Sequence, residues 1–187
     1  MNLLTVTNLS AGYAGKQVIK DISFFVAPKT IVGILGANGC GKTTLIKAIA
    51  NLLPHTGSCQ LDDTYLENAS PRQLALLCGY IPQKSGISID LTLLDVVLMG
   101  FNPKLSLLQS PTEQMKKEAF DALCSVGLGS RKDDNFQQLS EGQKQLCLLA
   151  RTFVLKRRLL LLDEPESALD FRLRYETMGL SRTYVAK

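Results

Sequence analysis

Hydrophobic residues in the first third of the chain form short runs of strand length. The segments at residues 3–9 and 19–26 are strand-like and are separated by a turn-rich stretch at residues 12–16. The next run, residues 30–35, is apolar without interruption, which is typical of a strand buried on both faces of a parallel sheet. The chain is therefore expected to begin with β-structure and then to enter an α/β core.

Helical spacing begins after a glycine-rich stretch. Residues 42–53 have the apolar period of a helix, which Pro54 is expected to end. Residues 57–61 and 76–81 are again strand-like. This alternation of strands with a helix predicts an α/β fold class.

The middle of the chain changes from strands to helices. Helical spacing covers residues 91–100, 111–126 and 140–154, and an apolar run of strand length returns at residues 158–162. We therefore expect an α/β core that is interrupted by a helical insert at residues 84–139 and resumes after it.

Length and composition fit one globular domain over residues 1–187. The chain is 45% hydrophobic and 20% charged, which is ordinary globular composition. Its net charge of +4 is small, and its basic residues form no long run, so the charge pattern does not indicate nucleic-acid binding. We expect the basic clusters at residues 116–117 and 156–158 to lie on solvated helix surface.

The sequence shows neither a membrane span nor a secretory signal. No segment reaches the ~20 consecutive apolar residues that cross a bilayer, and the N-terminus lacks a basic region followed by a long apolar one. We therefore expect the chain to stay in the cytosol. The five cysteines have no CxxC spacing, which argues against a zinc site or a disulfide framework and favours reduced, mostly buried thiols.

Residues 36–43 match the phosphate-binding pattern G-x-x-x-x-G-K-[ST]. The glycines let the backbone curl around a phosphate, and the following helix presents the positive end of its dipole. Lys42 is expected to reach the β- and γ-phosphates, and the Thr43 hydroxyl to bind Mg²⁺. The alternative is a glycine-rich turn that binds nothing, but a predicted strand before it and a helix after it are the context the motif requires. The candidate residues are Gly36, Ala37, Asn38, Gly39, Cys40, Gly41, Lys42, Thr43 and Thr44.

Cys40 lies inside this loop at the start of the helix, where thiols tend to be reactive. We expect Cys40 to be the most readily alkylated of the five cysteines, and MgATP to protect it. The alternative is that the loop buries its sulfur.

Two carboxylates follow the apolar run that ends at Leu162. Ligands bind at the carboxyl ends of strands in open α/β sheets, so Asp163 is a candidate to hold Mg²⁺ and Glu164 to polarise the attacking water as a general base. An acidic residue here could instead cap a helix, but the phosphate-binding loop upstream favours the catalytic interpretation.

A third motif, Leu-Ser-Glu-Gly-Gln at residues 139–143, precedes a predicted helix. It resembles the LSGGQ signature of ABC ATPases, and further features match that family in order. Tyr13 resembles the aromatic residue of the A-loop, Gln83 the glutamine of the Q-loop, and residues 167–170 the D-loop. The resemblance covers essentially the whole chain.

The resemblance implies a P-loop (RecA-like) core with an antiparallel β arm and a helical ABC subdomain. It also implies that Tyr13 stacks on adenine, that Gln83 acts in catalysis and contacts the Mg²⁺, and that Asp170 lies at the nucleotide. ATP and Mg²⁺ are the expected cofactors, and hydrolysis of ATP to ADP and phosphate is the expected reaction.

The resemblance further implies a head-to-tail dimer, in which Ser140, Gly142 and Gln143 of one subunit face the ATP of the other. The same residues by themselves predict a capping box at a helix start, and both interpretations can hold together. The expected partners are integral-membrane permease subunits, a second ATPase subunit and, indirectly, a periplasmic or extracellular substrate-binding protein. The expected location is the cytoplasmic face of the cell membrane, and no nucleic acid is expected to bind.

Three departures from the family pattern stand out. Glu141 replaces a signature glycine, which matters little if its side chain points to solvent but repels ATP if it points inward. Leu146 stands where many members carry arginine. The family has a switch histidine on a later strand, whereas this chain ends 17 residues after Asp170 and its one histidine, His55, lies upstream, where we expect an exposed loop residue. The sequence thus resembles a cassette truncated before that histidine, and the chain alone is expected to hydrolyse ATP slowly or not at all.

Residues 91–100 and 164–171 are similar to the corresponding segments in importers of iron–siderophore complexes, haem and cobalamin, which is the function that the resemblance implies. The alternatives are the ATPase of a zinc or manganese importer, or a truncated nucleotide-binding module without turnover. Soluble ABC proteins of translation carry two cassettes and those of DNA repair a long coiled coil, and neither arrangement fits this single short cassette.

Overall fold

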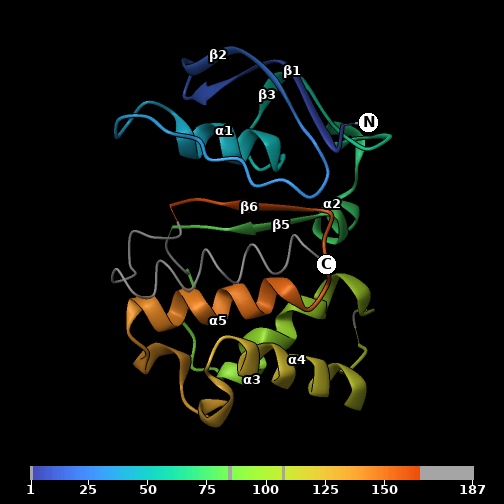
Figure 1. Ribbon diagram of the computed structural model, residues 1–187, viewed down its shortest axis with the longest axis vertical. Coiled ribbons are helices and arrows are strands. Elements are labelled where there is room, and N and C mark those ends of the chain that lie inside the picture. The colour runs from blue at the N-terminus through green and yellow to red at the C-terminus, as the bar shows by residue number, and fades with distance from the viewer. Residues whose placement is uncertain (1, 84–85, 107, 165–187) are drawn as a thin grey trace. The chain divides into compact units, whose positions relative to one another are not determined.

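The computed structural model describes residues 2–83, 86–106 and 108–164 (Figure 1). The described residues form two compact units, one extending to Leu74 and the other beginning at Ala75. We call them the first and second units and describe each by itself.

The first unit is built on a four-stranded sheet in the order β2-β1-β3-β4, with every neighbouring pair antiparallel. The strands are β1 (Leu4–Tyr13), β2 (Lys16–Val26), β3 (His55–Leu61) and β4 (Thr64–Tyr65). Ala14 and Gly15 join β1 to β2 and both have positive φ, as the tightest hairpin turns require. The strands predicted at residues 3–9, 19–26 and 57–61 are confirmed, and each extends beyond its predicted range.

Helix α1 (Lys42–Ile49) packs on this sheet through an apolar face formed by Leu45, Ile46 and Ile49. The helix ends earlier than the predicted Leu53. Asn51 adopts positive φ and its side-chain amide donates to the Leu66 carbonyl at 3.0 Å, which fixes the chain in a non-helical course before Pro54 is reached. Leu66 begins η1 (Leu66–Asn68), the short helix after β4.

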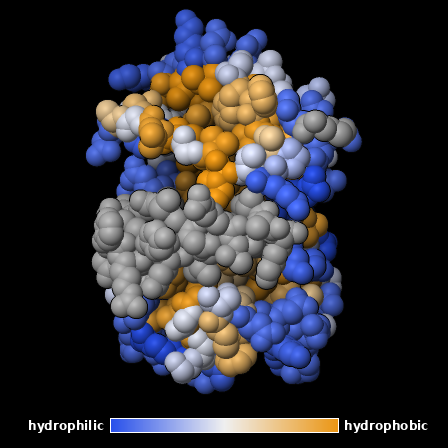
Figure 2. Space-filling view, in the orientation of Figure 1, coloured by the Kyte–Doolittle hydropathy of each residue, from blue (hydrophilic) through white to orange (hydrophobic). Residues whose placement is uncertain are grey.

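The prediction of a buried strand at residues 30–35, in the first unit, is wrong. These residues form no regular element, and Ile31, Val32 and Leu35 are 58%, 55% and 95% exposed. Among the described residues, the sheet of the unit does not include them, and a backbone without a neighbouring strand has no ladder of hydrogen bonds to hold it extended. Part of the apolar surface of this unit appears orange in Figure 2. The continuous apolar run at residues 30–35 therefore shows a preference for a buried strand, but it does not show which strand these residues would pair with.

The second unit joins a two-stranded parallel sheet to a set of helices. Strand β5 (Cys78–Ile81) pairs with β6 (Leu159–Leu162), with Cys78 opposite Leu159 and Ile81 opposite Leu162. The strand predicted at residues 76–81 begins two residues later than expected, at Cys78. The reason is that α2 (Pro71–Leu77), a helix that the sequence analysis did not predict, continues up to it. The other elements are α3 (Leu93–Leu98), η2 (Met99–Lys104), α4 (Glu113–Ser125), η3 (Gly129–Arg131), η4 (Phe136–Gln138) and α5 (Glu141–Phe153).

The helices of the second unit lie together (Figure 1), and they share one apolar core. Phe101 and Phe136 are its largest fully buried side chains, and α5 contributes Leu148 and Leu149. Thr112 caps α4, and Gly127 follows its end with positive φ, so the helix predicted within residues 111–126 is confirmed. The helical pattern predicted within residues 91–154 is thus confirmed, while the assignment of residues 84–139 as a separate subdomain stays a prediction.

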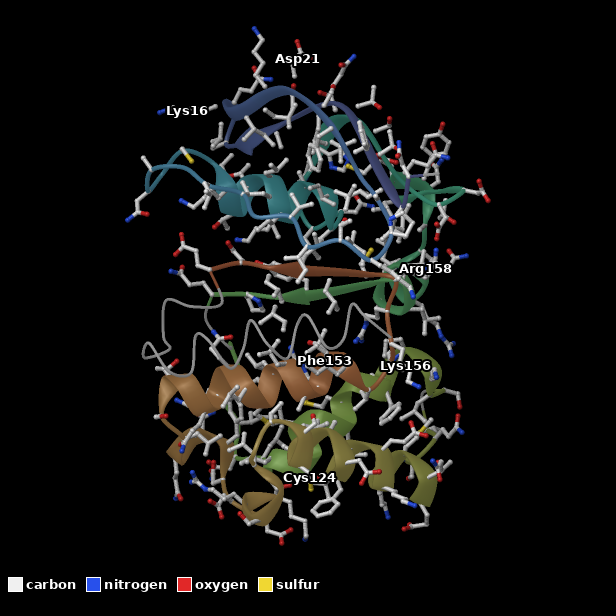
Figure 3. All side chains as sticks on the ribbon, in the orientation of Figure 1. Lys16, Asp21, Cys124, Phe153, Lys156 and Arg158 are labelled. Atoms are coloured by element: carbon white, nitrogen blue, oxygen red, sulfur yellow. The ribbon has the colours of Figure 1, made fainter. Side chains whose placement is uncertain are left out.

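The basic cluster at residues 156–158 is not the solvated helix surface that we predicted. It lies between α5 and β6, and Arg157 is partly buried, with its guanidinium donating to the carbonyls of Ala75 and Thr152 at 2.8 Å and of Gly100 at 3.4 Å. Figure 3 labels the flanking Lys156 and Arg158. A guanidinium can satisfy several carbonyls at once, which explains why this cationic side chain ties three elements together instead of extending into water.

Candidate functional site

The glycine-rich loop lies in the first unit and leads directly into α1. Gly39 and Gly41 have φ of 81° and 104°, and Gly41 is the N-cap of the helix. A β-carbon on Gly41 would lie 2.8 Å from Cγ2 of Ile19 on β2. Gly41 is therefore required both by its left-handed backbone and by the close approach of the sheet.

Lys42 reaches back over the loop. Its ammonium donates to the carbonyls of Gly36 at 3.0 Å and Ala37 at 3.1 Å, so a positive charge is held against the loop backbone. No side chain caps the start of α1, and its first turn contains no acidic residue. Positive charge and the helix dipole therefore act together at this loop, an arrangement that favours a phosphate.

The remaining predicted residues of the first unit differ in exposure. Tyr13 ends β1 opposite Lys16 and is 46% exposed, so its ring is accessible for stacking. Cys40 is exposed, which rules out a loop that buries its sulfur. Thr43 is partly buried, whereas Thr44 is 4% exposed and belongs to the buried face of α1.

The predicted carboxylates lie in the second unit, at the carboxyl end of β6. Asp163 is 2% exposed. Its backbone N–H donates to the Ile81 carbonyl at 3.0 Å, and the Tyr80 hydroxyl donates to its Oδ2 at 3.3 Å. Strand β5 therefore positions Asp163 through both main chain and side chain.

Gln83 and Glu164 are brought together although they are far apart in sequence. Gln83 Nε2 donates to Glu164 Oε2 at 2.7 Å. Glu164 itself has φ of 47°, a left-handed conformation that a non-glycine residue seldom adopts without support from its surroundings. The contact joins the two residues that the sequence assigned to catalysis.

Gln145 is a positioning residue that the sequence analysis missed. It lies on α5, is 3% exposed, and donates from Nε2 to the Gln83 carbonyl at 2.9 Å. The signal available in the sequence was a polar residue on the apolar face of an amphipathic helix, next to Leu146. Gln145 thereby connects the signature helix to the Gln83 segment.

The signature residues begin α5, as the capping-box interpretation predicted. Ser140 Oγ accepts from the Gln143 backbone at 3.3 Å, and Gln143 Oε1 accepts from the Ser140 backbone at 3.2 Å. The Glu141 side chain is 61% exposed and forms an ion pair with Lys144 at 2.9 Å, so the alternative in which it points to solvent is confirmed. Gly142 is buried. Asp170 lies outside the described residues.

Comparison with known proteins decides the family. A family model described as "ABC transporter" matches residues 19–167. The chain belongs to the ABC transporter family. An iron chelatin transport ATP-binding protein of Helicobacter pylori is 40% identical over 91% of this chain and 68% of its own length. The hemin import ATP-binding protein HmuV of Bordetella parapertussis is 36% identical over 96% of this chain and 71% of its own length.

Solved structures agree with this assignment. A metal-chelate type ABC transporter in an inward-facing conformation has a TM-score of 0.84 at 27% identity, covering 100% of this chain and 70% of that one. A nucleotide-free ATP-binding cassette has a TM-score of 0.87 at 23% identity, covering 100% of this chain and 78% of that one, which shows the fold. This chain is therefore an ABC-type ATPase cassette with the P-loop fold, as the resemblance implied. Slow or absent hydrolysis by the isolated chain stays a prediction.

Cysteine reactivity gives a direct test of the loop. Burial raises the pKa of Cys78 to about 11, although the nearby Arg157 lowers it in part. Burial likewise raises the pKa of Cys147 to about 12, against a smaller lowering by Arg151. Cys59 is buried as well. We expect iodoacetamide to modify Cys40 and Cys124, the two exposed thiols, and MgATP to slow the reaction of Cys40 alone.

Mass spectrometry of the peptides with and without MgATP measures both rates in one sample. Cys124, which lies on α4 (Figure 3), is the internal control. Equal modification of Cys40 with and without nucleotide would contradict the proposal that this loop binds the phosphates of ATP.

Proposed function

We propose that this ABC ATPase powers the import of an iron chelate, haem or cobalamin across the cell membrane. The relatives named for iron chelatin transport and hemin import support this substrate class. The observation that carries the ATPase part is the pair Gln83–Glu164 at the carboxyl end of β6, next to the buried Asp163. A general base beside a candidate metal ligand is what ATP hydrolysis needs.

The P-loop residues have distinct proposed roles. Residues 36–44 cradle the phosphates through their backbone N–H groups, Lys42 contacts the β- and γ-phosphates, and the exposed ring of Tyr13 stacks on adenine. The Gly36 and Ala37 carbonyls hold the Lys42 ammonium at the loop. A phosphate oxygen is a charged acceptor and would make the stronger hydrogen bond with it.

The residues proposed to hold Mg²⁺ are Thr43, Gln83 and Asp163. A hydroxyl, an amide carbonyl and a carboxylate are hard oxygen donors, which fit Mg²⁺. When bound, the ion supplies charge neutralisation at the β- and γ-phosphates. The Tyr80 hydroxyl orients the buried Asp163 carboxylate and would hold it in place for the ion.

Glu164 is proposed to accept the proton of the attacking water as the water oxygen bonds to the γ-phosphorus and the bond to the ADP oxygen breaks. Gln83 holds the carboxylate by the bond at 2.7 Å, and Gln145 holds the Gln83 main chain. The products are ADP and phosphate.

The signature residues are proposed to act on the ATP of a second ATPase subunit. Ser140, Gly142 and Gln143 start α5, whose N-terminus suits a γ-phosphate, and Asp170 is proposed to lie at the same nucleotide. The exposed ion pair of Glu141 with Lys144 keeps the extra carboxylate partly neutralised. Each site would then be complete only in a head-to-tail dimer.

Permease subunits are the proposed membrane partners, and a substrate-binding protein outside the membrane is the indirect one. The proposed location is the cytoplasmic face, held there by the permease. In the ranges that the structure describes, no helix combines the length and apolar character needed to cross a membrane.

Gln83 is proposed to couple the nucleotide to the permease, because it joins Glu164 to the segment that leads into the helices of the second unit. Replacing Gln83 by alanine is expected to abolish most transport while changing ATP affinity less than about threefold, since it removes the link and not the phosphate cradle. Transport in vesicles and nucleotide affinity are the two measurements, with Gln60→Ala on β3 as the control. Normal transport by Gln83→Ala would defeat the coupling proposal.

The substrate class is tested with the subunit assembled with its permease in vesicles. We expect the binding protein loaded with ferric siderophore, haem or cobalamin to stimulate ATP hydrolysis, because the proposed function couples hydrolysis to the import of that ligand. Stimulation by none of these three ligands would reject the proposed substrate class while leaving the ATPase assignment intact.

A further inference from the structure

Three potential metal ligands meet in the first unit, outside the residues assigned to the nucleotide. They are His55 at the start of β3, Cys59 on the same strand, and Glu67 in η1. One ligand atom from each lies within 4.8 Å of the other two. We call these residues the HCE cluster.

The hydrogen bonds of His55 set which ring nitrogen faces the cluster. Its Nδ1 lies 3.0 Å from the Leu53 carbonyl. Because a carbonyl can only accept, Nδ1 carries the proton and Nε2 of the neutral ring has a lone pair. A histidine that binds a metal through one ring nitrogen commonly donates from the other to an acceptor such as a main-chain carbonyl.

Glu67 is also held in place. The Cys59 backbone N–H donates to its Oε1, and the same oxygen lies 3.5 Å from His55 Nε2. Two lone pairs therefore face each other across a short gap when the ring is neutral. A cation between them removes the repulsion, and that cation is either a proton on His55 or a metal ion.

The sulfur of Cys59 favours a metal ion. It adds a third donor within 4.8 Å of the His55 and Glu67 ligand atoms, which is a set of ligands that a metal ion can use together. Cys59 is fully buried, the His55 side chain is 4% exposed and the Glu67 side chain 26% exposed. The cluster is thus preformed in the interior, with the glutamate on the side that reaches solvent.

The surrounding backbone supports this arrangement. Gly57 has φ of 86° beside an irregularity in the β1–β3 register, and a β-carbon there would lie 2.4 Å from the Asn8 carbonyl oxygen. A bulge of this kind bends a strand and re-aims its side chains. On the other side, Leu66 is fully buried and accepts from Asn51, which anchors η1 and Glu67 with it.

We propose that the HCE cluster binds one zinc-class divalent ion through His55 Nε2, Cys59 Sγ and a Glu67 oxygen, with water as the fourth ligand. An imidazole nitrogen and a thiolate favour zinc over Mg²⁺, which takes oxygen ligands. On binding, Cys59 releases its thiol proton to solvent. The ion links β3 to η1 and stabilises the first unit. The sequence analysis, which looked for CxxC spacing, missed this site because its ligands lie on a strand and a later turn.

The test uses the full chain, stripped of metal and free of nucleotide, titrated with Co²⁺ as a spectroscopic substitute for Zn²⁺. We expect one Co²⁺ per chain, a thiolate-to-cobalt charge-transfer absorption, and displacement of Co²⁺ by Zn²⁺. Cys59→Ser should remove the absorption. Substitutions of residues that only support the ligands of a metal site typically weaken metal binding by roughly 10–100-fold. His55→Asn and Glu67→Gln each remove a ligand, so each should weaken Co²⁺ binding by at least that much.

Cys124→Ser is the matched control, because Cys124 is an exposed cysteine outside the cluster, and it should leave the absorption unchanged. Circular dichroism and ATP affinity establish that each variant is folded. The wild-type melting temperature should rise with Zn²⁺, and that rise should be lost in Cys59→Ser. Absence of the absorption in the wild-type chain, or its persistence in Cys59→Ser, would overturn the proposal.

Discussion

Replacing Glu164 with glutamine is expected to slow ATP hydrolysis by about 10²–10⁴-fold, the usual contribution of a general base, while ATP affinity stays nearly unchanged. Glutamine has the shape of glutamate and can still pair with Gln83 through its carbonyl oxygen, but its amide does not accept a proton from water. The variant should therefore accumulate in the ATP-bound form.

The measurement is ATP turnover by the subunit assembled with its permease, alongside nucleotide affinity. Glu118→Gln on α4 is the matched control, since Glu118 contacts only Gln114 on the surface of the same helix among the bonds described. Turnover by Glu164→Gln within threefold of the wild-type value would show that another group is the base.

Replacing Lys42 with alanine is expected to lower ATP affinity by about 10–100-fold, because a hydrogen bond involving a charged group contributes roughly 1.5–3 kcal/mol. Hydrolysis should fall with it. The ammonium is already held against the loop by the Gly36 and Ala37 carbonyls, so the variant removes the positive charge without removing the glycines that shape the loop.

Lys47→Ala is the matched control for charge, since Lys47 lies in the last turn of the same helix. Fluorescent-nucleotide titration measures the affinity, and circular dichroism establishes that α1 remains folded. Unchanged ATP affinity in Lys42→Ala would contradict the phosphate-binding assignment of the loop.

Local features of the fold could be predicted because they depend on neighbours in sequence. The capping box of Ser140 and Gln143 and the stop at Gly127 involve residues within one turn of each other. The strand before Asp163 could likewise be predicted from its apolar run, whereas its pairing with β5 depends on residues distant in sequence.

Features that depend on distant partners were predicted less well. The run at residues 30–35 has strand composition but pairs with none of the described strands of the first unit. The cluster at residues 156–158 is basic, yet Arg157 is partly buried because three carbonyls surround it. His55 was predicted to be an exposed loop residue, but it begins β3 with its ring almost wholly buried against Leu53 and Glu67. The composition of a segment indicates its preference for a secondary structure and for burial, whereas its actual burial depends on which distant residues pack against it.

The chemistry of this protein could be predicted from sequence alone, because the motifs around Lys42, Ser140 and Asp163 combine residue types and spacings that phosphate binding, helix capping and metal binding require. How those residues are held depends on the three-dimensional fold. Gln83 meets Glu164 across 81 positions, Gln145 reaches the Gln83 carbonyl across 62, and the HCE cluster forms where a strand and a later turn converge. Contacts between residues so far apart depend on the packing of whole elements, which no local pattern encodes.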